Sequence, residues 1–163
     1  MDVRSALDLG LKGSEMIVNM YLGDLSDQDL LVRPVPGCNH IAWQLGHLIV
    51  SENMFTKSLR PALTPDLPAG FADKYSSANS KFDSAGAFDS KATLLQVMNE
   101  QRAGTRKALA DMKDSEWEEL PIEQFRGYCS NKADIFQLIG THWMMHAGQW
   151  AVIRRKLGKP PLF

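Results

Sequence analysis

The 163-residue sequence contains only two cysteines, Cys38 and Cys129, and they form no CxxC pair. A chain of this length can bury a sizeable core without disulfides, so both thiols are expected to be reduced, as in a cytoplasmic protein. No apolar stretch approaches the roughly 20 residues that cross a bilayer. Charged Asp2, Arg4 and Asp8 interrupt the N-terminal region, which disfavours a secretory signal. We therefore expect a cytoplasmic protein that does not associate with membranes.

An excess of charge of either sign is also missing, because 18 basic residues oppose 19 acidic ones. No long-range field therefore favours nucleic acid. Glycine patterns that bind phosphate and motifs around a serine or cysteine nucleophile are absent as well. The one basic cluster is typical of the last turn of a helix, where cations oppose the dipole; it consists of Arg154, Arg155, Lys156 and Lys159. The expected partner is a small-molecule substrate.

Helical periodicity dominates what the sequence does contain, and strand patterns are nearly absent. Asn39 is a good N-cap for the second helix, and Ser130 or Asn131 opens the fourth. With 44% hydrophobic and 23% charged residues, the composition fits one globular domain over residues 1–163. The sequence predicts four helices, at approximately 3–21, 39–59, 90–112 and 130–157.

The connection between the second and third helices, at approximately 61–89, is rich in Pro, Ala, Ser, Gly and Asp. It is too long for a tight turn between antiparallel neighbours, and loops of this length usually have a function or run over the surface. It suits an all-α bundle with a long crossover between its middle helices. We expect it to shape the mouth of any pocket.

Three of the four histidines lie where one metal ion could gather them. His142 and His146 are four residues apart on the last helix, so their side chains point the same way. Their predicted inward stripe is Ile135, Leu138, His142, His146, Gln149 and Ile153, with Ile139 and Met145 close by. Unpaired imidazoles cost free energy in such a setting, and either a metal or hydrogen bonds would satisfy them.

His47 on the second helix is the third candidate ligand. It lies about 12 Å from the start of its helix, while His146 and His142 lie about 16 and 22 Å from the end of theirs. These depths match if the two helices are antiparallel, although the count alone also allows a parallel pair. Three imidazoles without a cysteine would leave coordination positions open, which is typical of a catalytic or ligand-binding metal.

Other polar residues near these histidines are weaker candidates. His40 shares a helix face with His47 and is interpreted as a first-turn polar residue or a group at the rim of the pocket. Glu52 and Glu100 are interpreted as solvated charges rather than general bases. A ligating imidazole normally donates its second N–H to a polar group; the candidates for this contact are Gln44, Ser51, Gln101 and Gln149.

Three stretches of the sequence resemble the DinB-like superfamily of metalloenzymes, also called DinB/YfiT-like. The stretch 36–48, PGCNHIAWQLGHL, is similar to the family's motif on its second helix, which ends in a ligand histidine. The stretch 142–149, HWMMHAGQ, is similar to its HxxxH-x-GQ motif on the fourth helix. The stretch 154–161, RRKLGKPP, resembles its basic exit into a Gly/Pro tail. Length and helix layout agree over essentially the whole chain.

The resemblance implies a four-helix bundle in an up-down-down-up arrangement, often dimeric, that binds a divalent metal such as zinc or nickel. Carried over residue by residue, it assigns His47, His142 and His146 as the metal ligands; His40, Gln44 and Gln149 stay candidates for contacts around them on the spacing argument above. Family members are similar to thiol-dependent transferases and isomerases that use low-molecular-weight thiols, or to metal-dependent hydrolases. In this arrangement Cys38 and Cys129 should lie far apart.

Three hypotheses for the function follow. The first is a metal-dependent enzyme, with an S-transferase or a hydrolase as the reaction class and no identified acid or base. The second is a non-catalytic protein that binds metal or a small ligand, for instance in a stress response. The third is a structural bundle whose histidines are held by hydrogen bonds. An open cavity beside the histidines would favour the enzyme over the binder, whereas metal binding itself would exclude the third.

Overall fold

Four long α-helices make up most of the protein. The computed structural model describes residues 1–162, and within them every regular element is helical. The long helices are α1 (Val3–Leu22), α2 (Ile41–Leu59), α4 (Lys91–Asp111) and α5 (Lys132–Lys156). The predicted all-α class is therefore confirmed, and the predicted helix bounds are correct to within about two residues. None of the helices in this part of the chain is long and apolar enough to cross a membrane.

Short helices occupy the connections between the long ones. The crossover between α2 and α4 holds a single turn of α-helix, α3 (Phe71–Lys74), and three 3-10 helices. The 3-10 helices of the chain are η1 (Asp29–Leu31), η2 (Pro61–Leu63), η3 (Ser77–Asn79), η4 (Ala85–Ala87), η5 (Asp114–Glu116) and η6 (Glu123–Phe125).

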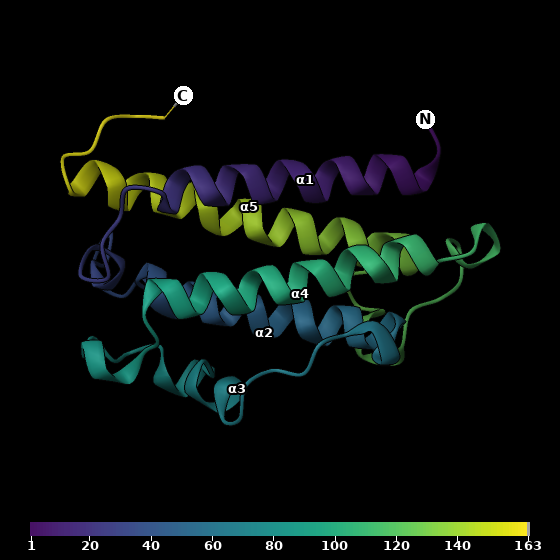
Figure 1. The fold of residues 1–163 in the computed structure, drawn as a ribbon, viewed down its shortest axis with the longest axis horizontal. Coiled ribbons are helices and arrows are strands. Elements are labelled where there is room, and N and C mark those ends of the chain that lie inside the picture. Colours follow the sequence, from purple (N-terminus) through teal and green to yellow (C-terminus); the bar gives the residue numbers. More distant parts are fainter. Residues whose placement is uncertain (163) are drawn as a thin grey trace.

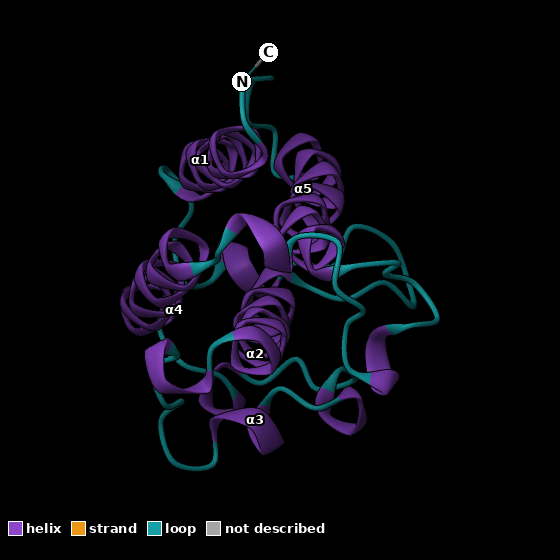
Figure 2. Ribbon diagram, turned by 90° about the vertical axis from the view of Figure 1, so that its right-hand side faces the viewer, coloured by secondary structure: helices purple, strands orange, loops and turns teal. Residues whose placement is uncertain are grey.

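The four long helices follow the predicted up-down-down-up arrangement. In Figure 1, α1 and α5 run in one direction and α2 and α4 run in the other, because the long crossover returns the chain to the end at which α2 began. Figure 2 shows α1 beside α5 and α4 beside α2, with α3 of the crossover below α2. The helices α2 and α5 are therefore antiparallel and begin at opposite ends. Cys38 and Cys129, which precede them, are free thiols.

Side-chain caps determine where the long helices begin. Asp2, Ser90 and Asn131 cap α1, α4 and α5 by accepting a backbone N–H from the residue three positions ahead. The cap of α2 is His40 and not the predicted Asn39, because Nδ1 of His40 accepts the backbone N–H of Trp43 at 3.2 Å. Histidine is an uncommon N-cap residue, whereas asparagine is a preferred one, so the sequence favoured Asn39 over His40.

The core is built around α2, which is buried along most of its length. On α5 the large buried side chains are Phe136, Trp143 and Trp150. The predicted inward stripe of α5 is buried at Ile135, His146 and Ile153, whereas His142 is only partly buried and Gln149 is exposed. Met145, predicted beside the histidines in the apolar environment, is 60% exposed. Trp143 and Trp150, which have large apolar surfaces, occupy the centre of the buried face of α5.

A charged network in the middle of the bundle corrects the interpretation of Glu52 as a solvated charge. Glu52 on α2 is buried and pairs with Arg102 on α4, with 3.0 Å between Oε2 and Nη2. It also accepts hydrogen bonds from the indole of Trp143 at 2.7 Å and from Thr105 Oγ1 at 2.7 Å. Arg102 in turn donates to Ser14 on α1 at 3.3 Å. The network therefore joins all four long helices. Glu100, by contrast, is exposed.

The crossover packs closely against α2 and α4, where both helices carry glycine. A Cβ at Gly46 of α2 would lie 2.0 Å from the ring of Tyr75, and one at Gly104 of α4 would lie 2.4 Å from Pro65. The Tyr75 hydroxyl donates a hydrogen bond to Asp89 at 3.0 Å. Instead of wandering over the surface, the crossover is fixed to the two helices.

The basic cluster at the C-terminal end of α5 binds the segment that follows α1. Arg154 is 3% exposed and forms an ion pair with Asp24. Lys159 lies 3.4 Å from the same carboxylate. The hydrogen bond from Arg154 is the largest cause that lowers the pKa of Asp24 to about 2. The cluster is thus a helix C-terminus, as predicted, and it also holds the C-terminal ends of α1 and α5 together.

Candidate metal centre

The three predicted ligand histidines converge between α2 and α5. His47 projects from α2, and His142 and His146 project from successive turns of α5. One ring nitrogen from each lies within 4.8 Å of the other two. The antiparallel packing of α2 and α5 produces this convergence, since it brings the first half of α2, which carries His47, beside the middle of α5, which carries His142 and His146.

The imidazole rings contact one another and one tryptophan. The ring centroid of His47 lies 5.2 Å from that of His142 and 5.6 Å from that of His146. His142 and His146 are 5.0 Å apart. Trp43, one turn before His47 on α2, stacks on it at 5.0 Å with an interplanar angle of 7°. The indole of Trp43 donates to the Ser76 carbonyl at 3.0 Å, so the crossover helps to hold the stacked pair.

The histidines are electrically neutral near pH 7. Burial lowers the pKa of His47. The pKa of His142 falls to about 4, first through burial and then through the neighbouring His47. The pKa of His146 also falls to about 4, through burial and then through the other two rings. Because metals bind the neutral imidazole, all three rings are ready to coordinate without losing a proton.

Gln44 is the polar residue that contacts a ligand histidine. Its Oε1 lies 3.0 Å from Nδ1 of His146 and accepts the indole N–H of Trp150 at 2.7 Å. Its Nε2 donates to the Asn39 carbonyl at 2.7 Å and to Oε1 of Gln149 at 3.0 Å. Gln149 therefore reaches the histidines only through Gln44.

The remaining predicted residues lie elsewhere. His40 is fully buried at the start of α2, and its Nε2 donates to the Phe82 carbonyl at 2.9 Å, so it fastens the crossover and does not line the rim of a pocket. Gln101 bonds Asn53 and the Pro65 carbonyl. Ser51 is buried. Burial lowers the pKa of the His40 ring, although its hydrogen bond to Phe82 acts in the opposite direction.

Two tryptophans around the site are not among the residues predicted from the sequence. Trp43 stacks on His47, and Trp150 donates a hydrogen bond to Gln44, which contacts His146. A signal was available: both lie four residues from a ligand, Trp43 before His47 and Trp150 after His146, and side chains at that spacing meet on a helix.

The donor set fits a divalent transition metal. Three nitrogens of a tetrahedral zinc lie about 3.4 Å apart, given bonds of about 2.0–2.1 Å. The ring nitrogens of the three histidines are at most 4.8 Å apart, and small rotations of the side chains can bring them to the spacing that zinc requires. The cluster that the described residues form contains no carboxylate or thiol, so three neutral ligands would leave at least one coordination position open. His47 and His142 are partly exposed, which leaves a way in for a ligand.

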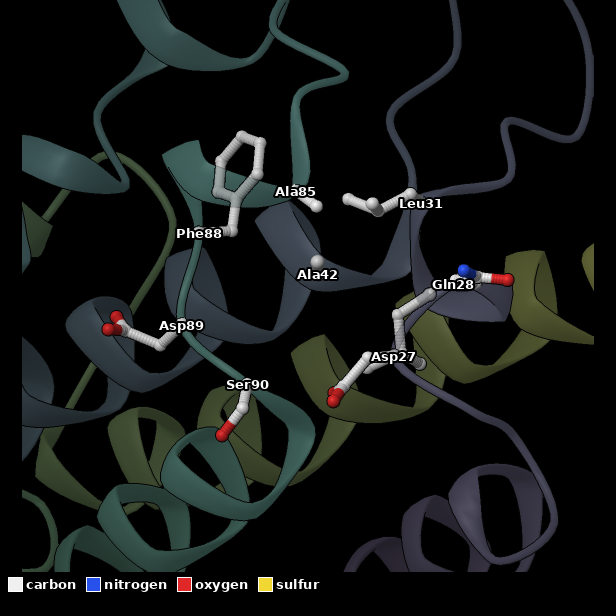
Figure 3. A pocket seen from close by; sticks show the side chains of 9 residues that line it. Asp27, Gln28, Leu31, Ala42, Ala85, Phe88, Asp89 and Ser90 are labelled. Carbon is white, nitrogen blue, oxygen red and sulfur yellow. The ribbon is translucent and has the colours of Figure 1, made fainter.

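A cavity of about 260 Å³ lies apart from the histidines (Figure 3). Ala42 at the start of α2, Leu31 and Phe88 form apolar walls, and Asp27 and Ser90 stand at its edge. The carboxylate of Asp27 accepts the backbone N–H of Lys91 at 2.5 Å, so it already caps α4. The two carboxylates of this cavity, Asp27 and Asp89, therefore already have hydrogen-bond partners within the protein.

Comparison with known proteins agrees with this architecture. A crystal structure described as that of the conserved protein of locus from Enterococcus faecalis superimposes with a TM-score of 0.73, covering 98% of this chain and 99% of that chain. At 16% sequence identity, it supports the fold alone. The sequence matches no curated protein. The family model described as the DinB superfamily matches residues 11–150, which include all three histidines. The chain therefore belongs to the DinB superfamily.

Proposed function

We propose that this protein is a metal-dependent enzyme that holds one divalent ion, zinc or nickel, on His47, His142 and His146. The convergence of three neutral imidazoles, without a carboxylate or thiol in the cluster, carries the proposal. Closed structural zinc sites use four protein ligands, whereas catalytic sites use three and keep one position for water or substrate.

The reaction class follows from the lack of a base in the site. A divalent ion on three neutral ligands lowers the pKa of a bound thiol or water and so supplies a nucleophile at neutral pH. Such chemistry needs no general base from the protein. Glu52, the buried carboxylate on α2, is occupied by Arg102, Trp143 and Thr105 and is not available as one. Both a bound thiol and a bound water fit this site; the resemblance to thiol-dependent members of the superfamily leads us to favour thiol-dependent transfer, with hydrolysis as the alternative.

The residues around the histidines have separate roles in this proposal. Trp43 holds the ring plane of His47 by stacking, and its own position depends on the crossover through Ser76. The partly exposed edges of His47 and His142 define the side from which a substrate enters. The crossover, anchored beside Trp43, stands next to this entrance.

A non-catalytic metal-binding protein is the second candidate. It would use the same three histidines, but its remaining coordination position would be blocked or already filled. The cavity of Figure 3 lies apart from the histidines, so the preference for the enzyme rests on the partial exposure of His47 and His142, which leaves this position within reach of a ligand.

Metal analysis of the purified protein tests the proposal. We expect about one equivalent of zinc or nickel in the wild type by plasma mass spectrometry, and its loss in the His142→Ala/His146→Ala double variant. His40→Asn is the matched control, because this histidine lies on α2 outside the cluster and should leave the metal content unchanged. No metal in the wild type, even after incubation with excess zinc or nickel under reducing conditions, would contradict the proposal.

A positive result would justify activity assays with low-molecular-weight thiols. Turnover that needs both metal and thiol would support the transferase, whereas turnover with metal alone would support the hydrolase. The homodimer expected from the resemblance stays a prediction, and sedimentation velocity tests it through a mass of twice 18.2 kDa.

A further inference from the structure

Gln44 is completely buried, and both ends of its amide are occupied. The carbonyl end, Oε1, faces His146 and Trp150. The amino end, Nε2, faces the Asn39 carbonyl and Gln149. A buried amide with four partners has a defined orientation, provided that at least one partner can act only as a donor or only as an acceptor.

Trp150 is such a partner on the carbonyl side. An indole N–H only donates, so the amide atom that it contacts at 2.7 Å must be the oxygen. The Asn39 carbonyl, which only accepts, demands the amino group on the other side at 2.7 Å. A rotation of the amide by 180° would place donor against donor at Trp150 and acceptor against acceptor at Asn39. The orientation of Gln44 is therefore determined by these two groups.

The orientation of Gln44 determines the state of His146. Because Oε1 of Gln44 accepts, Nδ1 of His146 at 3.0 Å must carry the hydrogen. A neutral imidazole carries one ring hydrogen, so Nε2 of His146 keeps its lone pair. Nε2 is then the nitrogen that can coordinate a metal. The opposite tautomer would present an N–H to the ion.

We propose that Trp150 and Gln44 are positioning residues that hold His146 in its Nδ1–H tautomer with Nε2 free for the metal. The inference rests on the proposed function, since it specifies the nitrogen through which one ligand binds. Hydrogen bonds of this kind orient ligating histidines and raise their basicity, and losing them typically costs 10- to 100-fold in metal affinity. Trp150 reaches the metal only through two intervening side chains.

The tautomer can be observed in the metal-free protein. Long-range ¹H–¹⁵N correlation spectra at pH 7, in the presence of a chelator, distinguish a protonated ring nitrogen from a bare one. In the wild type we expect His146 to be a single Nδ1–H tautomer. In Trp150→Phe one of the two groups that orient Gln44 is gone and only the Asn39 carbonyl is left, so we expect the Nε2–H tautomer to become populated beside the Nδ1–H form. Finding His146 mainly as Nε2–H in the wild type would overturn the proposal.

Trp143→Phe is the matched control. Trp143 is also a buried tryptophan on α5, but its indole donates to Glu52 and not to Gln44. We expect this variant to lose stability as Trp150→Phe does, yet to keep the wild-type tautomer of His146. If both variants shift the tautomer equally, general loosening of the core explains the effect and the proposal is wrong.

A rescue variant excludes a purely structural role. In Gln44→Glu/Trp150→Phe the carboxylate has no donor end, so it can only accept from Nδ1 of His146. We expect the Nδ1–H tautomer to return, even though the carboxylate no longer donates to Asn39. Persistence of the mixed tautomers would contradict the role assigned to Gln44.

Zinc affinity, measured by competition with a chromophoric chelator, gives a second readout. We expect Trp150→Phe to bind zinc 10- to 100-fold more weakly than Trp143→Phe. Equal affinities would overturn the proposal. If the wild type binds no metal, the proposed function fails, but the spectra of the metal-free protein still decide whether Trp150 and Gln44 set the tautomer.

Discussion

Glu52 of α2 and Arg102 of α4 form an ion pair at the centre of the bundle, with side chains that are 1% and 5% exposed. Further hydrogen bonds join the pair to Trp143 on α5, to Thr105 on α4, and to Ser14 and the Leu11 carbonyl on α1, so residues of all four long helices meet here. A buried pair of this kind adds little net stability compared with apolar residues, but removal of one partner leaves an uncompensated charge. The pair therefore penalises any arrangement of the helices that separates its members.

This relationship predicts an asymmetry between single and double variants. Arg102→Met should lower the free energy of unfolding by about 3–5 kcal/mol, because the Glu52 carboxylate stays buried without its cation. Glu52→Gln/Arg102→Met should be less destabilising than Arg102→Met alone, since no charge remains to be paired. Urea denaturation measures both.

The exposed pair Lys12–Asp8 provides the control. Its side chains are 57% and 32% exposed, and it spans one turn of α1. Lys12→Met should change the free energy of unfolding by no more than about 0.5 kcal/mol. If Glu52→Gln/Arg102→Met is no more stable than Arg102→Met, then the unpaired charge of Glu52 is not the cause of the destabilisation.

The number of long helices and the long crossover between the middle two could be predicted from the apolar periodicity and from the length and composition of the connection, whereas the up-down-down-up arrangement was implied by the resemblance to the DinB-like superfamily. The rotation of α5 could not be predicted. Its two tryptophans and its two histidines compete for the inward direction, and only the packing against α2 shows that Trp143 and Trp150 take the centre while His142 stays at the edge. The periodicity of a helix defines a stripe but not which neighbour the stripe meets.

The convergence of the three histidines was accessible from the sequence because the spacing of His142 and His146 and the depth of His47 are properties of ideal helices. The partner of His146 was only one of four candidates. Gln44 and Gln101 are both polar residues on inward faces, and the choice between them depends on distances across the bundle. The burial of Glu52 was missed for the same reason: its partner Arg102 is 50 residues away in the sequence.

His40 at the start of α2 should contribute to stability in two ways. His40→Ala should lower the free energy of unfolding by about 1–3 kcal/mol, because it removes the cap on Trp43 and the partner of the Phe82 carbonyl. His40→Asn keeps a good cap but is too short to reach Phe82, so we expect it to lose less. Equal losses in the two variants, measured by urea denaturation, would show that the cap contributes nothing.

The glycines beneath the crossover should not tolerate alanine. Gly46→Ala would force the ring of Tyr75 to move, and Gly104→Ala would collide with Pro65 and the Leu63 carbonyl. We expect each to lower the free energy of unfolding by about 1–3 kcal/mol and to speed proteolysis of the crossover. Gly13→Ala on α1 is the control: no other group lies within 4 Å of its added methyl, so it should raise stability by about 0.5–1 kcal/mol. A crossover as resistant to protease in Gly46→Ala as in the wild type would contradict the close packing.

The histidines should make the metal-free protein sensitive to acid well above the range in which most carboxylates titrate. In the folded chain the pKa values of His142 and His146 are about 4, whereas in the unfolded chain they return to about 6.5. Between these values the unfolded state binds protons that the folded state does not, so stability falls as the pH drops from about 6.5 through 4. Burial lowers the pKa values of His40 and His47 as well, and both act in the same direction.

Thermal unfolding in the presence of a chelator, recorded between about pH 6.5 and pH 4, should show this decline in stability. In His142→Gln/His146→Gln the decline should be shallower, because two of the four groups are gone. An equal slope in the double variant would mean that the two rings are already protonated near pH 6.5 in the folded protein, and the three-histidine cluster would then have to shed protons before it could hold a metal.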